Sequence, residues 1–399
     1  MTTTVNNEHK NLKVPNLRFK EFQGEWEKSK LSDLCTFFSG GTPSSSNKDF
    51  YGGDIAFIRS GELHANSTEL FISQDGYDNS SAKMVEIGDL LLAMYGATSG
   101  DIAISKIKGA INQAILCIRT NQNKKFIESV WNKHVSKILR KYLQGGQGNL
   151  SADIVKGISF SFPTLEEQER IANLISLLDE RIATQNKIIE DLKKLKSAIS
   201  KHLFSRKDLL ETTIRLADIA TLKNGYAFQS SKYETQGKWK ILTIANVSGE
   251  RYINDNDCNC IINLPNDIQA HQVLKEGDIL ISLTGNVGRV SLCKVGNYLL
   301  NQRVGLLHIT KNVDQEFLYQ ILSSRRFENC MVACGQGAAQ MNISKGDVEN
   351  FVLPYSSNGN SIRMIAGILQ SYDVFTINEL RILTLLTMQK QYLLHQMFI

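Results

Sequence analysis

An internal repeat limits the folds open to this 399-residue chain more than any other feature. The run Leu274–Leu283 (LKEGDILISL) follows the same pattern as Val85–Met94 (VEIGDLLLAM), roughly 190 residues earlier. In both halves a glycine-containing loop, a strand-like run and an Asn-Gln pair follow, at 112–113 and at 301–302. An offset that stays constant over several segments indicates a duplicated domain.

The repeat extends to both ends of each half. Leu31–Leu34 matches Leu216–Ile219, and Phe162-Pro163 matches Leu353-Pro354. A glycine run also recurs, at 145–151 and again at 335–344. We interpret both glycine runs as structural turns, with a close backbone approach to a nucleic-acid phosphate or to the neighbouring helix as the alternative.

Each half ends in a long helix-forming segment. Residues 163–204 contain no internal Gly or Pro, and apolar residues recur at steps of three and four, as in an amphipathic helix. Thr164 and Glu167 have the spacing of a capping box, and lysines gather toward the other end. At 1.5 Å per residue this helix would extend roughly 60 Å. A second apolar stripe starts at Ile365, but its first turn lacks the capping pair, so its start is less sharply defined.

The order globule, helix, globule, helix predicts how the apolar stripes are covered. The second helix can bury its apolar stripe most readily against that of the first helix, with the two helices antiparallel. We therefore predict an internally duplicated α+β fold, with two globular domains joined by two long helices in an antiparallel coiled coil and an approximate two-fold axis. The expected divisions are a flexible tail (1–13), a first domain (14–163), a central helix (164–206), a second domain (207–357) and a C-terminal helix (358–399).

Composition narrows the functional classes. No apolar run is long enough to span a membrane and the N-terminus lacks a signal sequence, so we expect a cytoplasmic protein. Seven cysteines, an odd number, indicate reduced thiols. A zinc site formed by Cys258, Cys260, Cys330 and Cys334 is disfavoured, because neither pair has the usual spacing. The net charge of +5 permits nucleic-acid binding without requiring it.

Several motifs together point to one family. They are both Gly-Asp-strand units, both Asn-Gln pairs, and the segments Pro15–Trp26 (PNLRFKEFQGEW), Gly40–Ser44 (GGTPS), Pro163–Gln168 (PTLEEQ) and Gly225–Ser230 (GYAFQS). In this order and duplicated, they give a chain that resembles the specificity (S) subunit of type I restriction-modification systems over almost its whole length.

The resemblance implies a DNA-reading protein with two target-recognition domains. Each domain would read one half of a bipartite, asymmetric target in double-stranded DNA. The helices would hold the half-sites about one helical turn, ~34 Å, apart. They would also dock two methyltransferase (M) subunits, to which two restriction/translocase (R) subunits can add. S-adenosylmethionine, ATP and Mg would belong to those partners, and the chain itself would have no catalytic role.

The residues agree with a non-catalytic role. An amino-methyltransferase needs an Asn/Asp-Pro-Pro-aromatic tetrad, whereas the five prolines of this chain are never adjacent. A motor needs a glycine-rich phosphate loop ending in Gly-Lys-Ser/Thr, and the sequence has none. Scattered histidines show no metal-binding spacing.

Candidate DNA contacts are polar, basic or aromatic residues on loops, which suit base edges and phosphates. In the first domain they are Thr42, Ser44, Ser45, Lys48, Arg59, Tyr95 and Thr98, and in the second Gln229, Ser231, Lys232, Tyr233, Asn246, Thr284, Asn286, Arg289 and Arg303. The identical Asn-Gln pairs more reasonably have a structural task, since domains that read different sequences should differ in their reading residues. Arg303 stands out because Ala114 is its counterpart.

For partner docking the candidates lie on the two helices. They are Glu167, Gln168, Ile171, Leu178, Ile182, Ile365 and Leu369. The competing hypothesis is a protein-protein scaffold, with two binding modules on a coiled-coil strut and no DNA in its function. Salt-dependent binding to duplex DNA would discriminate between the two, because phosphate contacts weaken steeply with salt.

Overall fold

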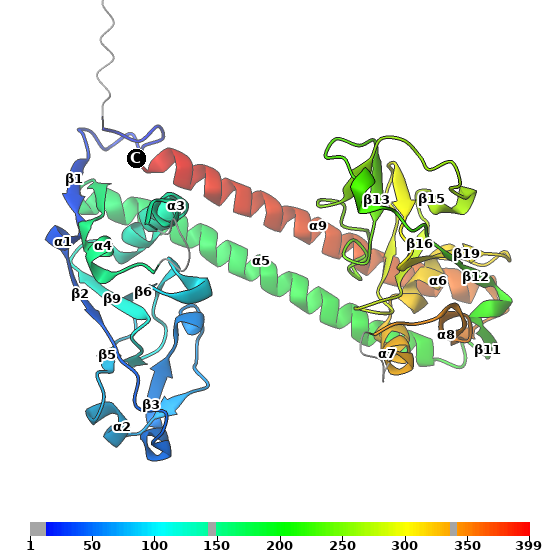
Figure 1. Cartoon of the computed structure of the whole chain (residues 1–399), viewed down its shortest axis with the longest axis horizontal. Coiled ribbons are helices and arrows are strands. Elements are labelled where there is room, and N and C mark those ends of the chain that lie inside the picture. The colour runs from blue at the N-terminus through cyan, green and yellow to red at the C-terminus, as the bar shows by residue number, and fades with distance from the viewer. Residues whose placement is uncertain (1–12, 143–148, 336–340) are drawn as a thin grey trace, which may run out of the picture. The chain divides into compact units, whose positions relative to one another are not determined.

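The computed structural model describes residues 13–142, 149–335 and 341–399 (Figure 1). They form two compact units: unit 1 comprises the chain up to Thr184 together with Leu383–Ile399, and unit 2 comprises Gln185–Ile382. The expected tail up to residue 12 and most of the first glycine run lie outside the described residues, as do residues 336–340 of the second run. Each long helix is divided between the units.

Unit 1 is built on two four-stranded sheets and a two-stranded ribbon. The first sheet has the order β2-β9-β6-β7 and is antiparallel throughout, whereas the second, β4-β3-β8-β5, contains one parallel pair, β3 with β8. The strands are β1 (Glu27–Lys30), β2 (Cys35–Ser39), β3 (Tyr51–Ile58), β4 (Phe71–Ile72), β5 (Lys83–Val85), β6 (Leu90–Ala93), β7 (Ile102–Ile104), β8 (Gly109–Ile111), β9 (Ile115–Thr120) and β10 (Ser159–Phe162); β1 and β10 form the ribbon. Short helices α1 (Leu31–Leu34), α2 (Gln74–Asp78) and α4 (Ala152–Gly157) accompany the longer α3 (Lys124–Tyr142).

Unit 2 repeats this topology strand for strand. Its sheets have the orders β12-β19-β16-β17 and β14-β13-β18-β15, again with one parallel pair, β13 with β18. The strands are β11 (Thr212–Arg215), β12 (Ala220–Asn224), β13 (Trp239–Leu242), β14 (Asn259–Ile261), β15 (Val273–Leu274), β16 (Ile279–Ser282), β17 (Val290–Leu292), β18 (Tyr298–Leu300), β19 (Val304–Ile309) and β20 (Val352–Tyr355). Helices α6 (Gln315–Leu322) and α7 (Arg325–Cys334) take the place of α3, and α8 (Lys345–Glu349) that of α4. The duplicated α+β fold predicted from the sequence is confirmed.

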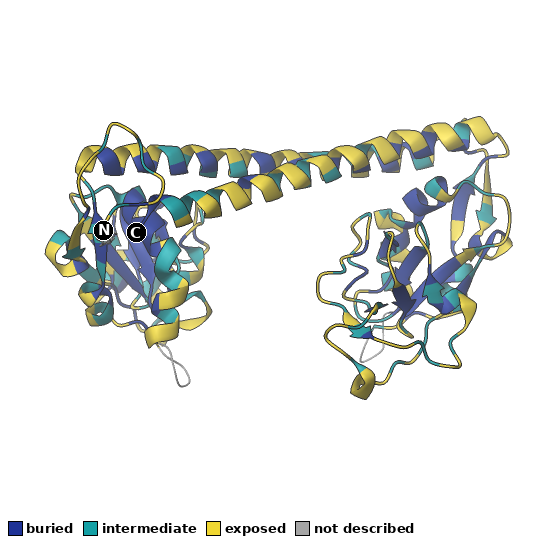
Figure 2. Ribbon diagram, turned by 90° about the horizontal axis from the view of Figure 1, so that it is seen from above, coloured by how far each residue is buried: buried dark blue, intermediate teal, exposed yellow. Residues whose placement is uncertain are grey.

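Two long helices carry the apolar stripes: α5 (Leu165–Ser205) and α9 (Gly359–Met397). In Figure 2, buried positions recur along both helices between exposed ones. Most stripe residues are buried or half-buried, but Leu195 is exposed.

Polar contacts fix the antiparallel register of the two helices. In unit 1 the Asp179 carboxylate pairs with Lys390 Nζ at 2.5 Å, and in unit 2 Lys196 Nζ pairs with Asp373 at 2.6 Å. Between these pairs, Gln185 Nε2 donates to the Glu379 carbonyl oxygen at 3.1 Å. Both ion pairs join an α5 residue to an α9 residue at matching positions of the repeat, so the register is set by equivalent residues in each unit.

The C-terminus completes the core of unit 1. Phe398 packs on Phe126 and Trp26, with ring centroids 5.1 and 6.4 Å apart, and the Leu17 N–H donates to the Gln396 carbonyl at 3.0 Å. Burial of several aromatic side chains at this junction supplies a large apolar contribution to stability. The last turn of α9 is therefore part of the same globular core as the first strands.

The start of α5 uses its capping residues differently from expectation. Thr164 Oγ1 does accept from the Glu167 N–H at 3.4 Å, but the Glu167 carboxylate does not return to the cap. It instead receives two hydrogen bonds of 2.7 Å from the Arg18 guanidinium and one of 3.4 Å from Trp26 Nε1.

Within the described part of the chain, no helix combines the length and apolar character needed to cross a bilayer.

Candidate nucleic-acid interface

The loops of unit 1 that carry most of the candidate residues meet at one edge of its sheets. Ser39 pairs with Leu116, and Ala93 with Ile115, so the ends of β2 and β6 and the start of β9 lie side by side. The parallel strands β3 and β8 end together at Ile58 and Ile111. We call the loops gathered here, residues 40–46, 59–62, 94–99 and 112–114, loop edge 1.

Unit 2 has the same construction. Asn224 pairs with Gly305 and Ser282 with Val304, while β13 and β18 end together at Leu242 and Leu300. The corresponding loops, residues 225–229, 243–246, 283–289 and 301–303, form loop edge 2. Both edges place polar loops on a rigid sheet, which is the usual arrangement of a binding surface.

The two edges share one scaffold. A Cβ at Gly40 would lie 1.7 Å from the Ile111 oxygen, and one at Gly225 would lie 2.6 Å from the oxygen of Leu300, the counterpart of Ile111, and 2.1 Å from that of Asn301, so only glycine fits either position. Asn112 Oδ1 accepts from the N–H two residues on, at 3.1 Å, and Asn301 Oδ1 does so at 3.2 Å. These contacts support the structural task expected for the asparagines, whereas Gln113 is exposed and accepts from Thr42 Oγ1 at 2.5 Å.

Not every candidate in unit 1 is equally available for a ligand. Thr42 and Ser44 are exposed at loop edge 1, and Tyr95 and Thr98 are half-buried there. Arg59 forms a forked pair with Glu62, at 3.0 and 3.2 Å. Burial pushes the pKa of Glu62 up, but the bonds from Arg59 outweigh it and the pKa is lowered. Lys48 lies at the opposite end of β3 from Arg59, on a short turn that precedes the strand, and Ser45 lies in an exposed turn leading to it.

In unit 2 Arg303 and Asn286 are exposed at loop edge 2, and no carboxylate of the described residues pairs with Arg303. Arg289 lies 3.8 Å from the Glu328 carboxylate, and Thr284 donates to Asn342 Oδ1 at 3.2 Å. Gln229 is exposed at the end of the first loop of this edge, Ser231 and Lys232 are exposed just beyond it, and Tyr233 packs on an apolar cluster.

The prediction that Asn246 contacts DNA needs a correction. Its side chain is only 5% exposed, and all of its polar atoms are engaged. The Oδ1 atom accepts from the N–H and hydroxyl of Thr243, while Nδ2 donates to the Asn254 oxygen and the Cys258 sulfur. These bonds close the loop after β13, so the geometry makes Asn246 a part of the scaffold and leaves nothing for DNA.

The sequence reasoning missed a cationic helix end at loop edge 1. Helix α3 ends beside this edge: Gly100 packs against Val135 and Leu139, and the Leu150 N–H beyond the helix donates to the Met94 oxygen at 3.0 Å. The last turns expose Lys137, Arg140 and Lys141, and none of them has an ion-pair partner among the described residues. The signal was present, because these cations immediately precede the first glycine run. The equivalent end of α7 carries Cys330 and Cys334 instead.

The residues expected to dock a partner are mostly used within the chain itself. Glu167, Gln168, Ile171, Leu178, Ile365 and Leu369 are all buried, and Ile182 is half-buried. Glu167 is held by Arg18, and Gln168 Nε2 donates to Gln122 Oε1 at 2.7 Å. These side chains already have partners within the chain, so any docking surface on the helices would have to be formed by their exposed neighbours.

Among the described residues, no group of three or more His, Cys, Asp or Glu side chains is placed so that it could hold a metal ion. Burial raises the pKa of Cys258 to about 11 and that of Cys117 to about 12, which keeps both thiols protonated at neutral pH. A protonated thiol is a poor metal ligand.

Comparison with known proteins is consistent with this geometry. The family model described as "Type I restriction modification DNA specificity domain" matches residues 23–194 and again 211–388. Two curated relatives from Methanocaldococcus jannaschii are each 24% identical: the type I restriction enzyme MjaVIII specificity subunit, over 78% of both chains, and the putative MjaX specificity subunit, over 84% of both.

Solved structures share the fold. The S subunit of a type I restriction-modification system from M. genitalium covers 97% of this chain and 99% of its own, with a TM-score of 0.61 and 17% identity. A chain from a structural study of complex assembly in the type I system covers 92% of this chain and 96% of its own, with a TM-score of 0.54 and 16% identity.

Proposed function

The chain belongs to the family of type I restriction-modification DNA specificity domains and is a specificity subunit, and we propose that each of its loop edges reads one half of a split, asymmetric DNA target. The observation that carries this proposal is the contrast between scaffold and surface. Gly40 and Gly225, like Asn112 and Asn301, make matching contacts, while the exposed side chains around them differ.

Different side chains on equal scaffolds are what an asymmetric target requires. Loop edge 1 offers the hydroxyls of Thr42 and Ser44 and is flanked by the cationic end of α3. Loop edge 2 offers Asn286 and Arg303, which pairs with no carboxylate of the described residues and whose guanidinium suits a bidentate contact to guanine. Two edges so different would not read the same base sequence, so the full target would not be a palindrome.

We assign the long helices to spacing and docking. Apart from their buried stripe they expose large apolar side chains to solvent: Leu177, Leu385, Met388 and Tyr392 in unit 1, and Phe375 in unit 2. Leu385, Met388 and Tyr392 are three and four residues apart, so they lie on one face of α9, and a contiguous exposed apolar patch marks a protein interaction surface. We infer that two methyltransferase subunits dock here, and that two restriction subunits can join them.

Chemistry in this proposal belongs to the partners. S-adenosylmethionine would be bound by the methyltransferase subunits, and ATP and Mg by the restriction subunits, while this chain selects the DNA. A scaffold without DNA in its function is disfavoured, because the family to which the chain belongs is one of DNA specificity domains.

A domain exchange tests the proposal. Residues 17–160 would be replaced by the matching segment of a relative, in cells that contain the methyltransferase, and methylated adenines would be mapped across the genome. We expect one half of the target to change and the other half to stay. A change in both halves, or in neither, would contradict independent reading by the two loop edges.

A further inference from the structure

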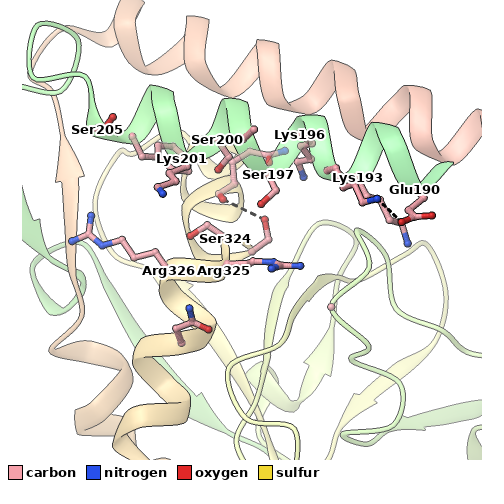
Figure 3. Close-up of a pocket in the computed structure, with 17 residues that line it drawn as sticks. Glu190, Lys193, Lys196, Ser197, Ser200, Lys201, Ser205, Ser324, Arg325 and Arg326 are labelled. Atoms are coloured by element: carbon pink, nitrogen blue, oxygen red, sulfur yellow. Dashed lines mark hydrogen bonds and ion pairs between the residues drawn. The ribbon is translucent and has the colours of Figure 1, made fainter. Parts of the chain in front are cut away.

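An open groove in unit 2 is dominated by positive charge. It has a volume of about 1220 Å³ and lies between the second half of α5 and the start of α7 (Figure 3). Six of its lining residues are cations: Lys193, Lys194, Lys196, Lys201, Arg325 and Arg326. Serine contributes five more positions, and Glu190 is the one acid of the described lining.

Three of the six cations pair with no carboxylate of the described residues, and one of these, Arg326, instead donates to the Val352 oxygen at 3.4 Å. Lys193, Lys194 and Lys196 pair with Glu250, Glu190 and Asp373. Lys201 and Arg325 have no carboxylate partner among the described residues. Figure 3 shows Lys201 extending from α5 toward the start of α7, where Arg325 lies.

The start of α7 adds to the positive potential. Its N-cap residue, Ser324, does not cap the helix: the hydroxyl donates to the Ile321 oxygen at 2.5 Å instead of accepting from the first turn. The first-turn N–H groups therefore remain available, and a helix start favours negative charge. Cations and such N–H groups are donors that proteins use on DNA phosphates, whereas three of the five serine hydroxyls, those of Ser205, Ser323 and Ser324, already donate to backbone oxygens.

The groove adjoins loop edge 2. Gly249 lines the groove, and the Arg289 side chain lies over it, 3.6 Å from where a Cβ of Gly249 would be. Arg289 also approaches Glu328 on α7, at 3.8 Å, and belongs to loop edge 2. A DNA backbone held at that edge can thus continue past Arg289 into the groove, and cationic side chains would line its whole path.

We propose that this groove holds the phosphate backbone of the duplex whose bases are read at loop edge 2, through contacts that are independent of sequence. The inference rests on the proposed DNA-reading function. Composition favours phosphate over an acidic protein segment, because cores of protein interfaces are depleted in Lys and Ser and enriched in aromatic residues. Here the apolar side chains of the described lining are only those of Ala198 and Phe204.

The test measures how binding depends on salt. The variant K201Q/R325Q would be assembled with its methyltransferase subunits and compared with wild type by fluorescence anisotropy on target and non-target duplexes. Each phosphate contact contributes about 0.9 to the slope of log K against log salt, so we expect the slope to become shallower by about 1.8 on both duplexes. Between 50 and 200 mM salt, the loss of affinity should then be about tenfold smaller than for wild type.

Controls separate the groove from general charge and from folding. K207Q/K311Q removes the same charge from exposed positions outside the groove and should leave the slope unchanged. K201R/R325K keeps the charge and should retain the wild-type slope, and matched melting curves exclude a folding defect.

The possible outcomes also separate the two proposals. If the salt slope of K201Q/R325Q is unchanged and its sequence preference is intact, the groove does not bind phosphate, and the proposed DNA-reading function stands. If the slope is shallower but the wild-type complex shows no preference for its target, the groove binds phosphate, and the proposed DNA-reading function is wrong. Loss of the methyltransferase from the K201Q/R325Q complex, with the slope of the remaining complex unaltered, would identify a protein-docking groove and overturn the phosphate proposal.

Discussion

Replacing Asp373 by Asn would test how α9 is fastened to unit 2. The Asp373 carboxylate accepts from Lys196 at 2.6 Å, Arg251 at 3.0 Å and Gln320 at 2.7 Å. Its side chain is 10% exposed, and that of Arg251 is 8% exposed. Asparagine keeps the shape and removes the charge, so two cations lose a partner in a site with little water.

The magnitude follows from burial. Breaking a buried ion pair by removing one partner costs roughly 3–5 kcal/mol. Because Arg251 keeps its pair with Glu316, we expect about 3 kcal/mol for D373N. Asp179 is the matched control: it occupies the equivalent position on α5 and pairs with Lys390 and Lys125, but its side chain is 28% exposed. Solvent screening should limit D179N to about 1–2 kcal/mol.

Hydrogen exchange followed by mass spectrometry reads each unit separately. Peptides from the central sheet of unit 2, residues 279–309, report on D373N, and those of unit 1, residues 90–120, report on D179N. A cost of about 3 kcal/mol corresponds to exchange faster by roughly 150-fold, and 1–2 kcal/mol to roughly 5- to 30-fold.

Two results would refute this reasoning. If the two variants lost equal protection in their own units, burial would not control the cost. If D373N left hydrogen exchange in unit 2 unchanged, the ion pairs of Asp373 would make no contribution to the stability of that unit. A K196M/D373M double variant that costs less than the sum of its single changes would show that the two residues act as one pair.

The remaining predictions concern pH and the shared scaffold. A hydrogen bond from Lys240 holds the pKa of Asp255 well below its usual range, burial opposes this, and bonds from Lys294 and Tyr298 add to it. The stabilisation by ionised Asp255 is fully present above the unfolded pKa of ~3.9 and declines as the pH falls below that value. We therefore expect D255N to lower the free energy of unfolding by about 2 kcal/mol at pH 7 and by clearly less at pH 3, as measured from urea unfolding midpoints. At loop edge 1, G40A would drive a methyl group into a backbone oxygen, so it should cost at least about 2 kcal/mol and lower methylation at the target. G157A lies at the end of α4, outside loop edge 1, and has open space around it, so it should be nearly neutral in melting and methylation assays. A neutral G40A, or a D255N deficit that is independent of pH, would contradict these accounts.

Periodicity and repetition predict the frame of this protein well. The expected helices at 164–206 and 358–399 correspond to α5 and α9. The uncertain start of the second helix also has an explanation: without a capping box, the Asn358 Oδ1 atom accepts from the Asn360 N–H. These features depend on neighbours within a few residues, which is the information that a local pattern contains.

Contacts between distant segments could not be predicted in this way. Periodicity shows that the face of α5 bearing Ile171 is buried, but not that Arg18 reaches Glu167 across the sequence. Polarity placed Asn246 among the candidate readers, yet its partners lie on the far side of its own loop. A side chain that closes a loop and one that contacts a ligand have the same composition, and only the fold separates them.

The ion pairs that connect each long helix to its unit show how two repeats can keep the same contact while using different residues. In unit 1 the cation that joins Asp179 to the domain is Lys125, on α3, which also pairs with Glu128 of that helix. In unit 2 the cation that joins Asp373 is Arg251, from a loop, and it pairs with Glu316 of α6. Aligning the halves by sequence does not match these cations, because they come from different elements. Since the aspartates and their α5–α9 lysines do match, the helix register constrains the chain more strongly than the connection to either domain does, and each domain can change its surface without disturbing the helices.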